Sequence, residues 1–166
     1  MIKRDMRRSD RLVTDRDTIE VFLDEAKVIH LGLEDDGEIY VVPLNYGWEW
    51  KGETLMLYCH SAREGRKIDL IGKGAKVGFS MESGVSYFGD EMACHYGNYY
   101  KSIIGSGEAS LLKEDEARSH ALNQIMAHYS DRDHWHFAPE MLAQVEVIAV
   151  CVQDFSCKIH GDPQTV

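Results

Sequence analysis

Apolar positions in this chain repeat with a helical period in some stretches and form short extended runs in others. One helical stretch covers residues 15–27, where apolar residues recur at helical spacing. Thr14 precedes it as an N-cap, and Asp17 follows three residues later, as in a weakened capping box. A short helix ended by a glycine is expected over 62–71. A longer helix is expected over 114–129, with acidic residues in its first turn.

The stretches between these helices are predicted to be strands, because short apolar runs alternate there with turn residues. The expected strands are residues 28–33, 39–46, 54–60, 76–81, 99–112 and 145–152, with 155–159 as a further candidate. Asp36-Gly37 lies between the first two runs and is a hairpin signal. Pro43 cannot donate a backbone hydrogen bond, so its strand lies at an edge, contains a bulge or faces a ligand. Residues 83–97 show no period, and we expect a long loop there.

Hairpin-spaced strands interrupted by helices indicate an α+β fold, an antiparallel β-barrel with helices packed outside it. The regular strand–helix alternation of a parallel doubly wound sheet is missing. A length of 166 residues suits one compact domain, and no proline-rich or low-complexity linker divides the chain. We therefore expect residues 1–166 to form a single domain.

The formal net charge of −10 argues against nucleic acid or an anionic membrane as a partner, because a phosphate surface attracts the opposite charge. Residues 1–16 are charged and lack the apolar run of a signal peptide. No stretch approaches the roughly 20 apolar residues that a membrane span needs. The four cysteines show no regular framework, so we expect reduced thiols and a cytoplasmic location.

Several common catalytic patterns are absent. The glycines near residues 72–78 lack the spacing of a dinucleotide-binding loop, and no Walker A sequence is present. Gly105-Ser106-Gly107 only superficially resembles a nucleophile elbow. His60-Ser61 and Cys94-His95 each combine a histidine with a nucleophilic side chain. The two members of each pair would point to opposite faces of a strand, because they are neighbours in the sequence. The absence of these patterns argues against a Rossmann site and against hydrolase chemistry.

Three histidines lie close together in the sequence. His128, His134 and His136 stand near Asp131 and Asp133, which allows a metal site. Neither HExxH nor CxxC occurs, and an ordinary polar surface loop is the favoured interpretation.

Residues 58–67 are the most informative stretch. They end a strand, offer the Ser61 hydroxyl and begin a helix that carries Arg66 and Lys67. A helix start supplies free backbone N–H groups, and Lys67 adds a point charge, so a monophosphate could bind here. Residues 63–76 contain five basic and two acidic side chains, which supports an anion site. The alternatives are a plain strand-to-helix turn capped by a serine and a solvated basic helix face.

The order and spacing of several segments resemble a known family. These segments are residues 6–11, 41–46, 60–62, 65–67 and 100–107. Together they are similar to the pyridoxamine 5′-phosphate oxidase-like FMN-binding split barrels, especially the nitroimidazole-resistance branch. Cys59 departs from this pattern, since a bulky apolar residue such as Phe is expected there.

The resemblance implies a six-stranded antiparallel split barrel that forms a homodimer with FMN at the subunit interface. The strand matching 42–46 would offer main-chain groups to the isoalloxazine, and the segment around residues 60–67 would surround the ribityl chain and phosphate. The strand matching 100–103 would approach the flavin from the second subunit. The implied cofactor-binding residues are Val42, Pro43, Leu44, Asn45, Tyr46, His60, Ser61, Ala62, Arg66, Lys67, Lys101 and Ser102.

The leading functional hypothesis is a flavin-dependent oxidoreductase that uses a small-molecule electron donor and acceptor, with nitroaromatic compounds as one acceptor class. His60 is the candidate catalytic side chain, against a buried structural histidine as the alternative. A non-catalytic flavin-binding protein is a second hypothesis. A haem-binding split barrel that uses His128, His134 or His136 as an axial ligand is a third.

Aromatic residues are concentrated in the expected loop 83–97 and in the strand after it. They include Tyr87, Phe88, Tyr96, Tyr99 and Tyr100. Buried contacts between subunits are rich in aromatic side chains, so we expect these residues at the homodimer interface. The alternative is that they cap one end of a monomeric barrel.

Overall fold

One antiparallel sheet dominates the structure, a computed structural model that describes residues 7–132 and 134–161. Its strands follow the order β3-β2-β6-β7-β8-β5-β4, and β1 pairs with β8 outside this path. The strands are β1 (Leu12–Val13), β2 (Ile29–Asp35), β3 (Glu38–Leu44), β4 (Tyr46–Lys51), β5 (Thr54–Ala62), β6 (Ala75–Phe88), β7 (Gly97–Leu111) and β8 (Val145–His160). The helical elements are η1 (Ser9–Arg11), α1 (Arg16–Glu25), α2 (Arg66–Ile71), η2 (Ala93–His95), α3 (Asp115–Tyr129) and α4 (Pro139–Leu142).

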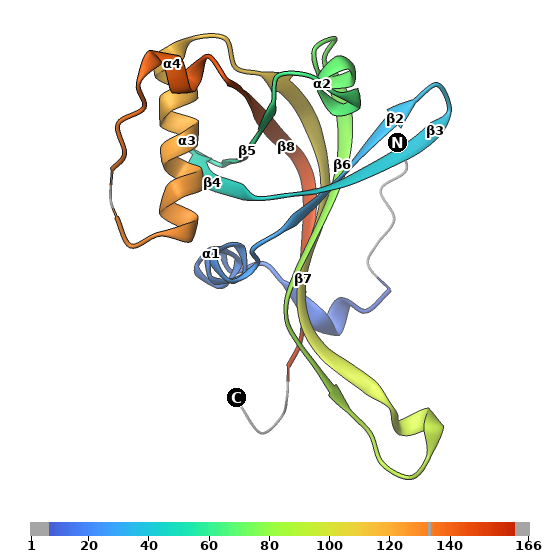
Figure 1. The fold of residues 1–166 in the computed structure, drawn as a ribbon. Coiled ribbons are helices and arrows are strands. Elements are labelled where there is room, and N and C mark those ends of the chain that lie inside the picture. The colour runs from blue at the N-terminus through green and yellow to red at the C-terminus, as the bar shows by residue number, and fades with distance from the viewer. Residues whose placement is uncertain (1–6, 133, 162–166) are drawn as a thin grey trace.

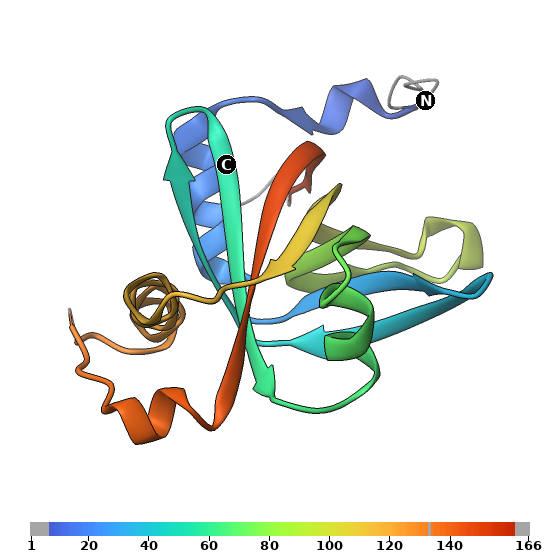
Figure 2. The same cartoon turned by 90° about the horizontal axis from the view of Figure 1, so that it is seen from above.

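The sheet curves into a barrel that stays open between β3 and β4, the two ends of the strand order (Figures 1 and 2). These strands are consecutive in the chain and are separated only at Asn45. The chain therefore crosses the open seam at Asn45. The predicted α+β class with an antiparallel barrel and flanking helices is confirmed, and the described residues contain eight strands instead of six.

Pro43 lies in β3, which among the described strands pairs with β2 alone and is an edge strand. Of the three alternatives that the sequence left open for Pro43, the edge position is the observed one, since an edge strand tolerates a missing donor. The strand expected over residues 39–46 ends at Leu44, because the chain changes sheet edge at Asn45.

The N-cap of α1 is Asp15 and not Thr14. The backbone N–H of Thr18 donates to the Asp15 carboxylate at 2.9 Å, which places the capping side chain one residue later than expected. The turn signal at Asp36-Gly37 is correct, since both residues have positive φ and join β2 to β3 in a two-residue hairpin. Helix α2 begins at Arg66, four residues later than predicted, because β5 continues to Ala62.

The long loop expected over residues 83–97 is wrong. Strand β6 continues to Phe88 and β7 begins at Gly97, so only a short connection containing η2 remains. The two strands form an arm that projects from the barrel (Figure 1). Much of the arm is exposed, which removes the apolar alternation that marks a half-buried strand.

The two strands expected over residues 145–152 and 155–159 are one strand, β8. Its pairing with β7 shifts between Val152 and Asp154, which leaves Gln153 as a bulge. The bulge interrupts the two-residue alternation of inward and outward side chains. The sequence pattern therefore predicts two strands where the structure has one.

The core fills the inside of the barrel. It consists of the inward side chains of the strands together with apolar residues of α1 and α2, such as Phe22, Leu23 and Ile71. A second cluster lies outside β5 and β8, where α3 and α4 pack with residues such as Ala121, Ile125 and Leu142. Gly47 of β4 allows this packing, because a Cβ there would overlap the backbone of Gln124 and Ile125 in α3.

Candidate functional site

The expected anion site is the corner where β5 ends and α2 begins. Gly65 precedes α2 with a φ of 127°, and its carbonyl accepts from the N–H groups of Ile68 and Asp69. The N–H groups of Arg66 and Lys67 come before these first intrahelical bonds, so the helix start leaves them available to a ligand. Ser61 lies on β5 just before this corner and is 8% exposed.

Lys67 and Arg66 differ in their surroundings. The Arg66 Nε lies 2.5 Å from Asp35 and its Nη2 3.4 Å from Glu38, and the guanidinium lies over the Tyr40 ring. Arg66 therefore fastens α2 to the β2–β3 hairpin. Lys67 is half-buried, and within residues 7–132 and 134–161 it has no hydrogen bond or ion pair. Lys67 is thus the cation at this corner with a charge that no described side chain compensates.

His60 is exposed on β5, opposite Val147 of β8. This exposure argues against the alternative interpretation of His60 as a buried structural histidine. The neighbouring Cys59 is fully buried, and burial raises the pKa of its thiol to about 12. Cys59 is therefore a core residue, and its departure from the family pattern leaves a small apolar side chain in the barrel.

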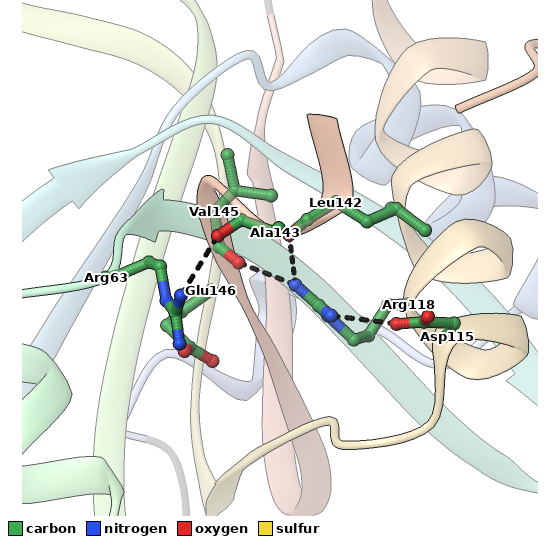
Figure 3. Close-up of polar contacts among 7 residues, drawn as sticks. All are labelled: Arg63, Asp115, Arg118, Leu142, Ala143, Val145 and Glu146. Carbon is green, nitrogen blue, oxygen red and sulfur yellow. Dashed lines mark hydrogen bonds and ion pairs between the residues drawn. The ribbon is translucent and has the colours of Figure 1, made fainter. Parts of the chain in front are cut away.

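Two arginines hold the chain that flanks this corner, as Figure 3 shows. Arg63 donates to the Ala143 carbonyl at 3.1 Å and lies 3.6 Å from Glu146. Arg118 of α3 donates to the carbonyls of Leu142 and Val145. Because both arginines contact the junction of α4 and β8, they fix the strand that pairs with residues 60–62. The Arg63 guanidinium is therefore already engaged by Ala143 and Glu146 of the same chain.

The predicted flavin-contacting stretch 42–46 follows the β3 edge of the open seam as far as Leu44 and crosses the seam at Asn45. Val42 and Leu44 pack on the barrel core, whereas Pro43 and Asn45 are exposed. The Tyr46 ring is fully buried and its hydroxyl donates to the Leu23 carbonyl at 2.6 Å. Since β3 pairs on one side only, its other edge leaves main-chain groups available along this stretch.

The outer face of β3, β2, β6 and β7 combines exposed apolar side chains with very small residues. Ile39, Val41 and Ile104 are 74%, 54% and 50% exposed. Between them, Gly32 pairs with Gly78, and His30 pairs with Ser80. The second core cluster, in which α3 packs on the barrel, lies instead on β5 and β8. Exposed apolar patches of this kind mark interaction surfaces.

Lys101 and Ser102 lie far from the β5–α2 corner within one chain. Helix α2 approaches β7 at Leu111, which is ten residues along the strand from Lys101. At about 3.3 Å per residue, that separation is roughly 30 Å along the strand. The Lys101 ammonium lies 2.6 Å from the Glu25 carboxylate, so its charge is compensated in the chain. These two positions therefore belong to a different region of the protomer than Ser61 and Lys67.

The three clustered histidines do not form one group. His128 is buried, and its Nδ1 and Nε2 lie 2.8 and 3.1 Å from the carbonyls of Tyr46 and Asp24. His134 and His136 are exposed, and Asp133 lies outside the described residues. Within the described part of the chain, no three potential metal-ligating side chains come together. No helix there is long and apolar enough to cross a membrane.

The fold is shared with several solved structures. A proposed 5-nitroimidazole antibiotic resistance protein from Bacteroides thetaiotaomicron is 28% identical, with a TM-score of 0.75 over 89% of this chain and 86% of that chain. An FAD and heme binding protein from Mycobacterium smegmatis is 17% identical, with a TM-score of 0.78 over 92% of this chain and 75% of that one. An FAD-binding protein from Mesorhizobium loti is 20% identical, with a TM-score of 0.61 over 89% and 96%.

No curated protein matches the sequence. The sequence model of one protein family, described as pyridoxamine 5′-phosphate oxidase, matches residues 15–159, which is most of the chain. The matched segment includes every described strand except β1 and the last residue of β8. The chain therefore belongs to the pyridoxamine 5′-phosphate oxidase family.

Proposed function

We propose that this protein binds FMN between two copies of the chain and acts as a flavin-dependent oxidoreductase. The observation that carries the proposal is Lys67, a half-buried cation without a described partner beside a helix start in a chain of net charge −10. A phosphate at this corner would find the Lys67 ammonium, the Ser61 hydroxyl and two free N–H groups. Ala62 would allow close approach of the ribityl chain.

In this proposal Lys67 and Arg66 contribute differently to binding of the FMN phosphate. Lys67 is the direct ligand in this proposal. Arg66 shares its charge with Asp35 and Glu38, so its main role is to hold α2 in place and its main-chain N–H is the group offered to the phosphate. The main-chain edge of residues 42–46 would run beside the isoalloxazine, with Tyr46 fixed by the core.

The dimer in this proposal uses the exposed outer face of β3, β2, β6 and β7. Val41 and Ile104 would be buried there, and the glycines and serines between them would let the second copy approach closely. Lys101 and Ser102 of the second copy would complete the flavin site, which agrees with their distance from Lys67 within one chain. The projecting arm adds exposed aromatic surface, including Tyr87 and Tyr96.

FMN supplies the two-electron chemistry when it is bound. The chain contributes binding of the phosphate, orientation of the ring along β3 and exclusion of water by the second copy. His60 is exposed within two residues of Ala62, and it is the side chain proposed to deliver a proton to the reduced substrate. The relative from B. thetaiotaomicron makes a nitroaromatic compound the first acceptor class to try.

Two alternatives predict different results. A purely flavin-binding protein would bind FMN without turnover, and a haem-binding barrel would need an axial ligand. Both ring nitrogens of His128 already contact carbonyl oxygens, so that histidine is a poor haem ligand. The test is turnover of FMN-loaded protein with a reduced nicotinamide and a nitroaromatic or quinone acceptor. The proposal expects turnover that falls in the His60→Ala variant, and FMN binding without turnover would leave the non-catalytic alternative. A cytoplasmic location remains part of the proposal.

A further inference from the structure

A cavity lies on the side of the barrel that α3 covers. Its volume is about 530 Å³, within the usual range for small-molecule sites. Its apolar part consists of side chains from β5, β8, the start of α3 and the segment between β7 and α3, namely Met56, Leu112, Ala117 and Ala149. Its polar part consists of Glu49, Lys51, Tyr58, Glu114, Glu116 and His120. None of these residues takes part in the proposed flavin site.

The polar wall is an ordered network centred on Glu49. The Tyr58 hydroxyl donates to Glu49 at 2.5 Å, and His120 Nε2 lies 3.0 Å from both carboxylate oxygens. The Lys51 ammonium is 3.3 Å away. Burial opposes the charged carboxylate, but these three partners hold the pKa of Glu49 below its ordinary value. Burial, with the bond to Glu49, raises the pKa of Tyr58 to about 12, so Tyr58 remains a neutral donor at neutral pH. The network fixes this wall in one arrangement.

The mouth of the cavity is negatively charged. Glu114 and Glu116 line it from the start of α3, and within the described part of the chain neither has an ion pair. The neighbouring Asp115, by contrast, is paired with Arg118 at 2.9 Å. The cavity is therefore lined by three carboxylates, those of Glu49, Glu114 and Glu116, and by one ammonium, that of Lys51.

We propose that this cavity binds a small organic cation, a primary ammonium carried on a compact apolar or aromatic body. The body would lie against Met56, Leu112 and Ala149, where it replaces water on an apolar surface. The ammonium would lie at the mouth between Glu114 and Glu116, where charge-assisted hydrogen bonds form. The cavity shares no lining residue with the proposed flavin site, and α3 packs on β4, β5 and β8, away from the exposed face of β3, β2, β6 and β7.

Three probes of similar shape test the charge preference on FMN-saturated protein: 2-phenylethylamine, 2-phenylethanol and 3-phenylpropionate. Binding is followed by the ¹³C-methyl signal of Met56, which the Met56→Leu variant assigns. The proposal expects the amine to shift this signal and to bind at least about tenfold more tightly than the alcohol, since two charge-assisted contacts are gained. The carboxylate should bind most weakly, and the amine should bind equally well to protein with and without FMN.

Two variants with matched controls locate the ligand. Ala117→Leu fills the apolar part and should abolish amine binding, whereas Ala127→Leu at an exposed position of the same helix should not. Glu116→Gln should weaken the amine about threefold and leave the alcohol unchanged, as expected for one partly exposed ion pair. Glu140→Gln on α4 is its control. Equal affinity for amine and alcohol, or an Ala117→Leu variant that binds the amine normally, would overturn the proposal.

Discussion

Replacement of Lys67 by alanine should weaken FMN binding selectively. Lys67 is half-buried and lacks a described partner, so the variant removes one charge-assisted contact to the phosphate without breaking an ion pair in the chain. Such a contact contributes about 1.5–3 kcal/mol, which corresponds to a loss of roughly ten- to hundredfold in affinity. The free energy of unfolding without flavin should change by no more than about 0.5 kcal/mol, as for other surface substitutions.

The assay is a titration of FMN and riboflavin fluorescence with wild-type and variant protein. Riboflavin lacks the phosphate, so Lys67→Ala should leave its affinity unchanged. Lys73→Ala is the matched control, because Lys73 is an exposed lysine just beyond the other end of α2. If Lys67→Ala weakens both flavins equally or weakens neither, or if Lys73→Ala has the same effect, the phosphate does not bind at this corner.

Three further predictions concern the dimer and the barrel. Ile104→Glu places a charge on the exposed sheet face and should convert a dimer into a folded monomer in light scattering, while an unchanged dimer mass would exclude this face as the interface. Gly47→Ala should lower the free energy of unfolding in urea by about 1–3 kcal/mol, because its Cβ would press on the backbone of α3, and an unchanged midpoint would contradict that packing. Burial and Lys27 lower the pKa of His128 below about 6.5, so the unfolded chain binds more protons below that pH. Stability should therefore fall as the pH decreases through about 6.5, more steeply in wild type than in His128→Asn, and equal slopes would refute this assignment.

The sequence pattern predicts the barrel well where one side of an element is buried. The helix containing Ile19, Phe22 and Leu23 has the expected face in the core, and the Asp36-Gly37 turn joins the expected strands. The arm was not predicted, because its strands are largely exposed and carry no alternating pattern. The single strand β8 was divided, since the bulge at Gln153 shifts the period by one residue.

The candidate sites show a similar limit. The strand-to-helix pattern identifies the corner with Ser61 and Lys67, since it depends on neighbours in the sequence. The partners of Arg66 could not be predicted, because Asp35 and Glu38 lie about thirty residues earlier and meet Arg66 only through the sheet. The network of Glu49 and His120 was missed for the same reason, since 71 residues separate them. Its only local signal is Glu49 between two tryptophans, which places Glu49 on the outer face of a strand.

Flavin retention after reconstitution is the decisive measurement for an FMN site at Lys67. The purified protein is incubated with FMN, desalted, and its visible absorbance is compared with its protein concentration. We expect the flavin doublet with one FMN for each chain in a dimeric fraction, because each corner at Lys67 binds one phosphate. A desalted protein without flavin absorbance, or one that carries a Soret band instead, would contradict it.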